Sequence, residues 1–364
     1  MKVLNLIWGF TLGAGIDKCF LTYARLGEVD RDIEVKSVCI NLLNLNSHIE
    51  PLKEIGADFV NIKNRRDLSW VGKLKKVIDG EQPDVIFTHG FNGAIVILIE
   101  RMLKSMKVPA VFTYHGLYNP PSFSRKILVP IYNGLPIWIY KHIAKRVISV
   151  SKDSGKQLTD RGVPVEKVVT VYNGIKDLTT DEKVVMKNNV VNIVSCSRID
   201  AIKGLDKLLD SLSVLRDKGL RFHYYMIGEG PELDSLKRHC AELQLNEFVT
   251  FAGYQTNIPE WLNGADIFTI TSYQENHSIA ILEAMRAGKA IVATNVGGNG
   301  ESIRNAEEGY LVPVGNVDAL ADAIEKLIAD ETLRNQIGAN ARKRFEAEFT
   351  EEAMMKNLVK VLKS

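Results

Sequence analysis

The stretch Tyr172-Asn173-Gly174-Ile175, continued by polar residues 176–189 and then by Val190-Val191-Asn192-Ile193-Val194, decides how this chain is organised. The first segment ends a β-branched run with the turn-forming pair Asn-Gly, and the last segment begins a new apolar run. A polar connection between two core strands marks a domain boundary. We therefore expect one domain over residues 1–173, a linker over 174–190 and a second domain over 191–345.

Short β-branched runs alternate with helix-length amphipathic segments on both sides of this boundary. We expect strands at 3–7, 33–40, 58–62, 84–88, 109–114, 146–150 and 167–171, and again at 191–196, 222–227, 248–252, 266–270, 289–294 and 310–312. Helices are expected at 204–217, 231–243, 278–287 and 317–330. Repeated βα units with continuously apolar strands predict an α/β chain of two doubly wound parallel-sheet domains. From about residue 331 the chain reads as helical, and 346–364 is expected to pack back on the N-terminal domain.

The composition is that of an ordinary globular protein. The chain has 364 residues, of which 46% are hydrophobic and 25% charged, and this excludes collagen-like, disulfide-scaffold and disordered classes. Its four cysteines stand far apart with no C-x-x-C pair, which is typical of reduced thiols and a cytoplasmic location. No apolar stretch reaches the roughly 20 residues that cross a bilayer.

The net charge of +2 hides an asymmetry between the two halves. Residues 1–172 contain 24 Lys and Arg against 16 Asp and Glu, so the remainder is acidic. No acidic residue occurs between Glu100 and Asp153. This interval mixes cations with aromatic residues: Arg101, Lys104, Lys107, Phe123, Arg125, Lys126, Tyr132, Trp138, Tyr140, Lys141, Lys145, Arg146 and Lys152. Such a mixture favours an anionic membrane surface, with a basic rim of a soluble acceptor cleft as the alternative. No nucleic-acid-binding module accompanies it.

A glycine turn, Gly13-Ala14-Gly15, follows the first expected strand. Such a turn lets backbone N–H groups approach a phosphate at the carboxyl end of a strand. Lys18 stands where the dinucleotide fingerprint needs a third glycine, which weakens the dinucleotide interpretation. A turn near a phosphate and a purely structural turn both stay open.

Two cations, Arg198 and Lys203, follow the expected strand 191–196. An Arg fork and a Lys point charge five residues apart suit one diphosphate, although two solvated loop cations would look the same.

Two carboxylates, Glu275 and Glu283, flank the start of an expected helix. Asn276 or Ser278 can cap this helix, and free N–H groups near Ile279 would face the same strand ends as the two cations. The carboxylates could grip hydroxyls of a sugar and of a ribose. The alternative is one capping carboxylate and one ordinary surface Glu.

His115 ends an expected buried strand in Thr113-Tyr114-His115-Gly116. A strand-end histidine is either a functional group or a satisfied core residue. The triplet Asp30-Arg31-Asp32 precedes a strand and is interpreted as a solvated turn, so we expect no metal site.

Taken together, these motifs resemble the retaining family-four glycosyltransferases (glycosyl transferases group 1) with the GT-B fold, in which two Rossmann-like domains face a central cleft. The ordered features are the early glycine loop, residues 113–116, residues 197–204, Gly228-Glu229-Gly230-Pro231, and Glu275 with Glu283. The segment Ile291-Val292-Ala293-Thr294, followed by Gly297-Gly298, also resembles the family. The step Asn276-His277 departs from the small residues that many relatives have there, which leaves the choice of sugar open.

The resemblance implies a role for each matching residue. Arg198 and Lys203 would bind the donor diphosphate and stabilise its developing charge, with Glu275 and His115 near the transferred sugar. Glu283 would hold the ribose. The remaining donor contacts would come from Gly13, Gly15, Gly228, Gly253, Tyr254, Ser278 and Ile279.

The function implied is retaining transfer of a hexose-type sugar from a nucleotide-diphosphate donor, without a metal or other cofactor. UDP-sugars are slightly preferred over GDP-sugars because they are common donors in the family. We expect a saccharide acceptor, carried on a lipid, in the biosynthesis of cell-surface polysaccharide such as lipopolysaccharide or capsule. The expected location is cytoplasmic and peripheral on the inner face of the plasma membrane. The alternatives are a nucleotide-sugar 2-epimerase, a noncatalytic nucleotide-sugar or polysaccharide-binding subunit, and a dinucleotide oxidoreductase.

Overall fold

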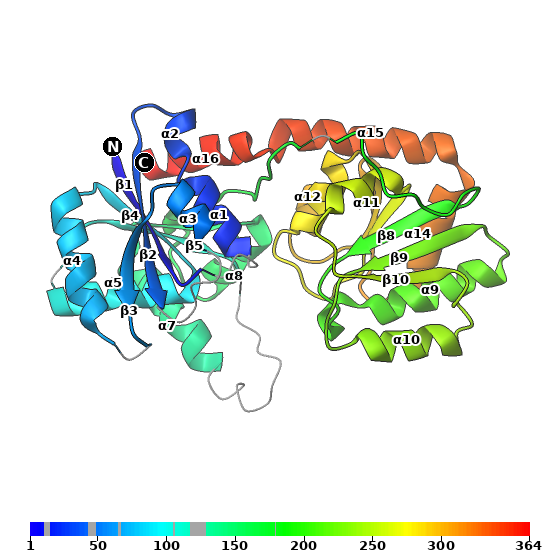
Figure 1. Cartoon of the computed structure of the whole chain (residues 1–364), viewed down its shortest axis with the longest axis horizontal. Helices are drawn as coiled ribbons and strands as arrows, with labels where there is room; N and C mark the ends of the chain where they lie inside the picture. The colour runs from blue at the N-terminus through cyan, green and yellow to red at the C-terminus, as the bar shows by residue number, and fades with distance from the viewer. Residues whose placement is uncertain (11–14, 43–48, 65–66, 105, 117–128, 179) are drawn as a thin grey trace. The chain divides into compact units, whose positions relative to one another are not determined.

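A computed structural model of the chain describes residues 1–10, 15–42, 49–64, 67–104, 106–116, 129–178 and 180–364. The chain divides into two compact units, Met1–Tyr172 with Met354–Ser364, and Asn173–Ala353. Each unit contains a parallel β-sheet with helices on its faces (Figure 1). The predicted α/β class with two doubly wound domains is therefore confirmed. Residues 174–178 and 180–190, expected as a linker, belong to the second unit.

The first unit contains a sheet in the order β3-β2-β1-β4-β5-β6-β7. The strands are β1 Lys2–Trp8, β2 Glu34–Leu42, β3 Asp58–Ile62, β4 Val85–His89, β5 Ala110–Tyr114, β6 Arg146–Ser149 and β7 Val168–Thr170. All adjacent pairs are parallel. The strand order reverses between β1 and β4, and in open α/β sheets ligands bind at the carboxyl ends beside such a point.

Helices cover both faces of this sheet. They are α1 Gly15–Tyr23, α2 Leu26–Val29, α3 Glu50–Glu54, α4 Ser69–Glu81, α5 Gly90–Lys104, α7 Val129–His142, α8 Lys152–Asp160 and α16 Glu351–Lys363. Every residue of β4 and β5 is buried, which explains why these strands read as continuous apolar runs. Trp70 and Leu74 of α4 and Ile97 of α5 pack into the core on one face.

The C-terminal helix α16 packs on the other face of the first unit's sheet. Met354, Leu358 and Leu362 join a buried cluster with Val3 of β1 and Phe87 of β4. At the end of the helix, Lys363 Nζ lies 2.7 Å from Asp30 Oδ2, and the backbone N–H of Asp32 donates to Asp30 Oδ1 at 3.0 Å. The triplet Asp30-Arg31-Asp32 therefore forms a turn whose Asp30 pairs with Lys363.

The second unit repeats the architecture with a sheet in the order β10-β9-β8-β11-β12-β13. The strands are β8 Val191–Cys196, β9 Phe222–Ile227, β10 Val249–Gly253, β11 Ile267–Ile270, β12 Ala290–Thr294 and β13 Gly309–Val312. The order reverses between β8 and β11, which are adjacent and parallel. The carboxyl ends of these two strands are therefore the expected ligand-binding edge of the sheet.

The helices predicted for the second unit are present, and the structure adds two short ones, α11 and α13, which the sequence did not predict. The helices of this unit are α9 Leu205–Asp217, α10 Leu233–Glu242, α11 Ile258–Gly264, α12 Ile279–Arg286, α13 Asn299–Ser302, α14 Val317–Ala329 and α15 Glu331–Glu348, with a short 3-10 helix, η3, at Ala201–Lys203. Leu208, Leu212, Tyr224 and Ile324 lie at the centre of the core between helices and sheet.

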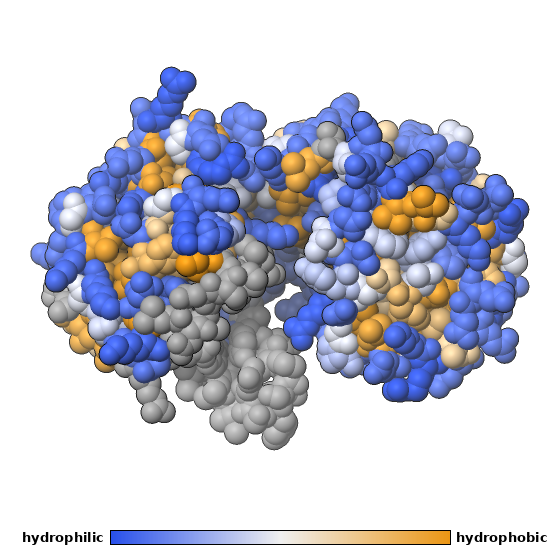
Figure 2. Space-filling view, in the orientation of Figure 1, coloured by the Kyte–Doolittle hydropathy of each residue, from blue (hydrophilic) through white to orange (hydrophobic). Residues whose placement is uncertain are grey.

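On the face that Figure 2 shows, hydrophilic residues predominate, with groups of hydrophobic residues on both units. Within the described residues, every helix is too short or too polar to cross a membrane.

Candidate active site

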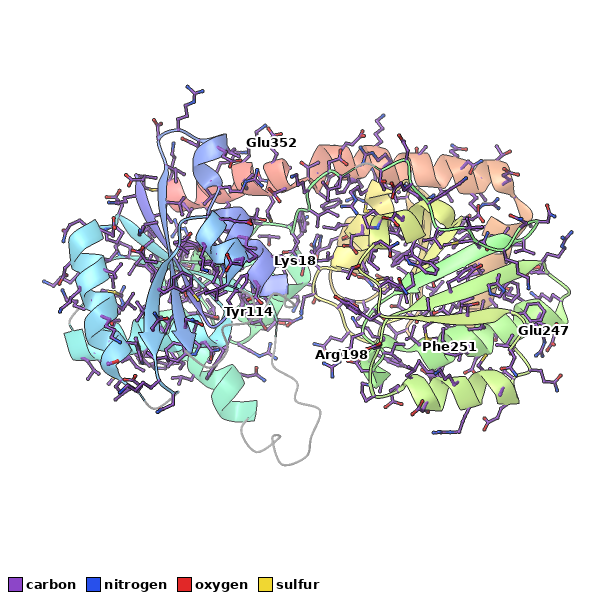
Figure 3. The ribbon with its side chains drawn as sticks, in the orientation of Figure 1. Lys18, Tyr114, Arg198, Glu247, Phe251 and Glu352 are labelled. Carbon is purple, nitrogen blue, oxygen red and sulfur yellow. The ribbon has the colours of Figure 1, made fainter. Side chains whose placement is uncertain are left out.

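The site is built on two loops that follow the adjacent strands β8 and β11. Residues 197–204 leave β8, and residues 271–278 leave β11. Figure 3 shows Arg198 at one end of the second sheet and Glu247, which precedes β10, at the opposite end. The two loops therefore lie at the carboxyl edge, where the strand order reverses.

Two hydrogen bonds to backbone carbonyls join these two loops. The Thr271 hydroxyl donates to the carbonyl of Lys203 at 3.0 Å, and the Tyr273 N–H donates to the carbonyl of Ile202 at 2.8 Å. Gly204 makes the close approach possible, because a Cβ at this position would lie 2.4 Å from the Thr271 carbonyl oxygen. Its φ of 59° also lies in the left-handed region that favours glycine.

Lys203 and Glu275 form an ion pair across the two loops. Lys203 Nζ lies 2.8 Å from Glu275 Oε1, and the Ser272 hydroxyl donates to the same carboxylate oxygen at 2.7 Å. The side chains of Lys203 and Glu275 are only 22% and 12% exposed. Two residues that the sequence assigned to the donor diphosphate and to the sugar are thus in direct contact.

Arg198 has a different environment from Lys203. Its side chain is 69% exposed, and its Nε lies 3.5 Å from Asp200 Oδ2. The guanidinium is therefore a solvated cation at the edge of the site that forms an ion pair with Asp200.

The two glycines of Gly228-Glu229-Gly230 pack closely against the backbone of the loop that contains Arg198. A Cβ at Gly228 would lie 1.9 Å from the Ser197 carbonyl oxygen, and one at Gly230 would lie 2.0 Å from that of Ile199. The Gly228 N–H donates to the Gly253 carbonyl at 2.8 Å. The backbone of this motif is thus engaged in positioning residues 197–199, a role that the sequence did not indicate.

Gly253 ends β10 at the same edge of the sheet, and Tyr254 follows it. Gly253 has a φ of 68° and open space where a Cβ would lie. Tyr254 is 70% exposed. Their predicted role beside the nucleotide base stays a prediction.

Helix α12 begins at the expected place. Ser278 is its N-cap, and the Ser278 hydroxyl accepts from the backbone N–H of Ile281 at 3.4 Å. Ile279 is the first helical residue, and the half-buried Glu283 lies in the second turn. The predicted contacts of Ser278, Ile279 and Glu283 with a donor stay predictions.

His277 is part of the protein core. It is 5% exposed, and its Nε2 lies 3.1 Å from the Ser302 hydroxyl. Burial, with a smaller contribution from Arg344, lowers the pKa of His277 to about 3. The step Asn276-His277, which departs from the family pattern, thus fills the core with a neutral imidazole. The Gly298 N–H donates to the Asn276 carbonyl at 3.0 Å. This hydrogen bond connects the step Asn276-His277 to the turn that follows β12.

The first unit contains the remaining predicted residues. His115 directly follows β5, and burial lowers its pKa to about 4, so the imidazole is neutral at pH 7. Gly15 begins α1, whereas Gly13 lies outside the described residues.

Sequence reasoning missed His89, the last residue of β4, which is 4% exposed. Its Nε2 lies 3.1 Å from Asn5 Oδ1, and burial, with a smaller effect of His115, lowers its pKa to about 3. The signal that could have found it is its place at the end of an apolar run, directly before Gly90.

A groove of about 590 Å³ adjoins the two loops and lies between the N-terminus of α9 and helix α10, with Asp200 and Tyr273 of the loops in its lining. Its lining combines cations and carboxylates: Asp200, Asp206, Lys207, Glu232, Arg238, His239 and Glu242. Lys207 and His239 are both engaged by Asp210, at 2.9 Å and 2.7 Å. Among the described residues, no cluster of three or more His, Cys, Asp or Glu is arranged to hold a metal ion.

Comparison with known proteins agrees with this geometry. Residues 178–344 match the family described as glycosyl transferases group 1, and residues 49–177 match glycosyltransferase family 4. The chain is a glycosyltransferase of the family-four type.

Curated relatives are enzymes of the same kind. The chain is 24% identical to N-acetyl-alpha-D-glucosaminyl L-malate synthase of Bacillus anthracis, over 79% of this chain and 77% of the relative. It is 28% identical to the lipopolysaccharide core biosynthesis glycosyltransferase LpsE of Rhizobium meliloti, over 61% and 62%. It is 23% identical to UDP-Gal:alpha-D-GlcNAc-diphosphoundecaprenol alpha-1,3-galactosyltransferase of Escherichia coli, over 78% and 76%.

A solved structure with the same fold is Anabaena HepE in complex with UDP. It superposes with a TM-score of 0.81 at 21% identity, over 100% of both chains. The fold is therefore GT-B, as the sequence predicted.

Proposed function

We propose that this glycosyltransferase transfers a hexose-type sugar from a UDP-sugar to a saccharide acceptor carried on a lipid, with retention of anomeric configuration and without a metal ion. The observation that carries the donor assignment is the meeting of Lys203 and Glu275, at 2.8 Å, at the carboxyl edge of β8 and β11. A cation for phosphate and a carboxylate for sugar hydroxyls are thereby presented together. One relative, whose name includes UDP-Gal and diphosphoundecaprenol, supports the choice of donor and acceptor.

The reaction breaks the bond between the anomeric carbon and a phosphate oxygen of the donor. The diphosphate leaves with the bonding electrons, so negative charge grows beside Lys203 and Arg198. The acceptor oxygen attacks the same face of the sugar and gives its proton to the departing phosphate. Glu275 holds sugar hydroxyls in this scheme, Glu283 holds the ribose, and neutral His115 contacts the sugar. No covalent enzyme intermediate is required.

Exposed apolar residues on α5 and α7, two helices of the first unit that contact each other, support the proposal of a membrane-bound acceptor. Met102 and Leu103 of α5 are 73% and 61% exposed, and Trp138 of α7 is 49% exposed. Arg101 and Lys141 lie beside them in the sequence. Exposed apolar side chains next to cations suit an anionic inner leaflet. Phe123, Arg125 and Lys126, which contributed to the same prediction, lie outside the described residues.

The deciding experiment incubates the full chain with a panel of UDP- and GDP-sugars in EDTA, with and without lipid-linked saccharides. We expect one donor to raise the melting temperature and to be consumed rapidly only when an acceptor is present. Conversion of the donor to its 2-epimer without acceptor would instead identify an epimerase. Binding without turnover, with every acceptor, would identify a binding subunit.

A further inference from the structure

In the described structure, Glu275 forms an ion pair with Lys203, the cation that is proposed to bind the donor diphosphate. The Glu275 carboxylate accepts from Lys203 Nζ at 2.8 Å and from the Ser272 hydroxyl at 2.7 Å, both at Oε1. The pair is mostly shielded from water, since the two side chains are 22% and 12% exposed. A Coulomb attraction is screened less in such a place than on an open surface.

The pair is also held in position through the backbone. Thr271 fixes the carbonyl of Lys203 at 3.0 Å, and Gly297 approaches the Glu275 carbonyl so closely that a Cβ there would lie 1.7 Å from the oxygen. Lys203 and Glu275 therefore begin from fixed backbone positions. The pairing therefore orders only the two side chains and requires no further ordering of the backbone.

A bound diphosphate has to compete with Glu275 for Lys203. Two anions that share one ammonium repel each other, and a displaced Glu275 loses a hydrogen-bond donor in a poorly hydrated place. A nucleotide-sugar compensates for this loss, because the hydroxyls of its sugar can donate to Glu275. A nucleoside diphosphate without a sugar brings the same phosphate charge and no such donor.

We propose that Glu275 is a built-in competitor for Lys203, which weakens binding of the nucleoside diphosphate by-product relative to the nucleotide-sugar. This inference rests on the proposed donor site. Once the sugar has been transferred, Glu275 loses its hydroxyl partners and returns to Lys203. The by-product is thereby expelled, and the site is restored to the state that the structure shows.

The test is calorimetric titration of the full chain in EDTA with UDP, GDP and inorganic pyrophosphate. Pyrophosphate reports on the anion site without any base. We expect Glu275→Gln to bind pyrophosphate, and the matching nucleoside diphosphate, about three- to tenfold more tightly than the unchanged protein, as when one modest ion pair stops competing. Stopped-flow release of the nucleoside diphosphate should slow by a similar factor.

Three further variants, one at the predicted ribose contact and two at Lys203, test whether the tightening comes from competition for Lys203. Glu283→Gln, at the predicted ribose contact, should weaken nucleoside diphosphate binding and leave pyrophosphate binding unchanged. Lys203→Met should weaken both ligands, and adding Glu275→Gln to Lys203→Met should give no tightening, because the competition is over Lys203. If Glu275→Gln does not fold, Glu275→Asp carries the test, since its shorter side chain withdraws the carboxylate from Lys203.

The outcomes separate this inference from the proposed function. Equal or weaker pyrophosphate binding by folded Glu275→Gln overturns the competitor role and leaves the donor site standing. Absence of binding for all three ligands, in the unchanged protein and in every folded variant, overturns the donor site itself.

Discussion

The hydroxyl of Thr271 donates a hydrogen bond of 3.0 Å to the backbone carbonyl of Lys203. This bond joins the loop after β8 to the loop after β11, which are far apart in the sequence and adjacent in the sheet. It fixes Lys203 independently of the Lys203 side chain. The site therefore depends on how closely the two loops approach at Gly204.

Gly204→Ala should destabilise the second unit and reduce turnover. The new Cβ would lie 2.4 Å from the Thr271 carbonyl oxygen, and the residue would keep a left-handed φ of 59°. Gly219→Ala is the matched control, because Gly219 has a φ of 75° with open space around a Cβ. We expect about 1 kcal/mol of destabilisation for Gly219→Ala from the backbone alone, and at least about 2 kcal/mol for Gly204→Ala. Urea unfolding measures both, and equal losses would contradict the close contact.

Arg198→Ala and Lys203→Ala should each lower turnover by about 100-fold or more, the usual effect of removing a preorganised donor from a developing anion. Arg198 is 69% exposed, so its removal leaves no cavity in the core. Lys207→Ala is a matched control in the next turn, where the lysine pairs with Asp206 and Asp210. Steady-state kinetics measures the turnover of each variant, and circular dichroism confirms that each variant is folded. Near-normal turnover in the folded double variant Arg198→Ala/Lys203→Ala would refute the cationic clamp.

The buried imidazole of His277 should make stability depend on pH. Burial lowers its pKa to about 3 in the folded chain, whereas an unfolded histidine titrates near 6.5. Between these values the unfolded chain binds more protons, so stability falls as pH decreases below about 6.5. At 1.36 kcal/mol per unit, a fall from pH 7 to pH 5 removes about 2 kcal/mol.

The variant His277→Gln should lack this part of the pH dependence, because glutamine keeps a donor for Ser302 and does not titrate. His142→Asn, at an exposed position of α7, is the control. Urea unfolding at pH 7 and pH 5 gives the difference for each protein. If His277→Gln loses as much stability on acidification as the unchanged chain, the imidazole is not buried in the neutral form.

Replacing the exposed apolar residues of α5 and α7 should weaken binding to anionic vesicles. Met102→Ser/Trp138→Ser removes side chains that are 73% and 49% exposed, and we expect co-sedimentation with phosphatidylglycerol vesicles to fall about threefold or more. Val185→Ser, at a 90% exposed position of the second unit, is the control. Added salt should weaken binding of the unchanged chain. Binding that ignores both anionic lipid and salt would exclude membrane docking through this surface.

Local patterns in the sequence were sufficient for the elements and for their class. Apolar β-branched runs predicted the strands of both sheets, and helix-length segments between them predicted a parallel arrangement. The cap at Ser278 could be predicted because capping depends on residues within one turn. The family motifs also predicted that Lys203, Glu275 and Glu283 contact one sugar donor, and this role stays a prediction.

The contacts of these residues depended on the tertiary structure. Lys203 and Glu275 are separated by 72 positions, and only the pairing of β8 with β11 brings them to 2.8 Å. The same holds for His277, whose imidazole is buried by Ser302 and the surrounding core. Sequence by itself determined which elements form and which residue types follow each strand, because those signals are local. Tertiary structure decided which of these side chains neutralise one another, because strand order brings together residues that no local pattern connects.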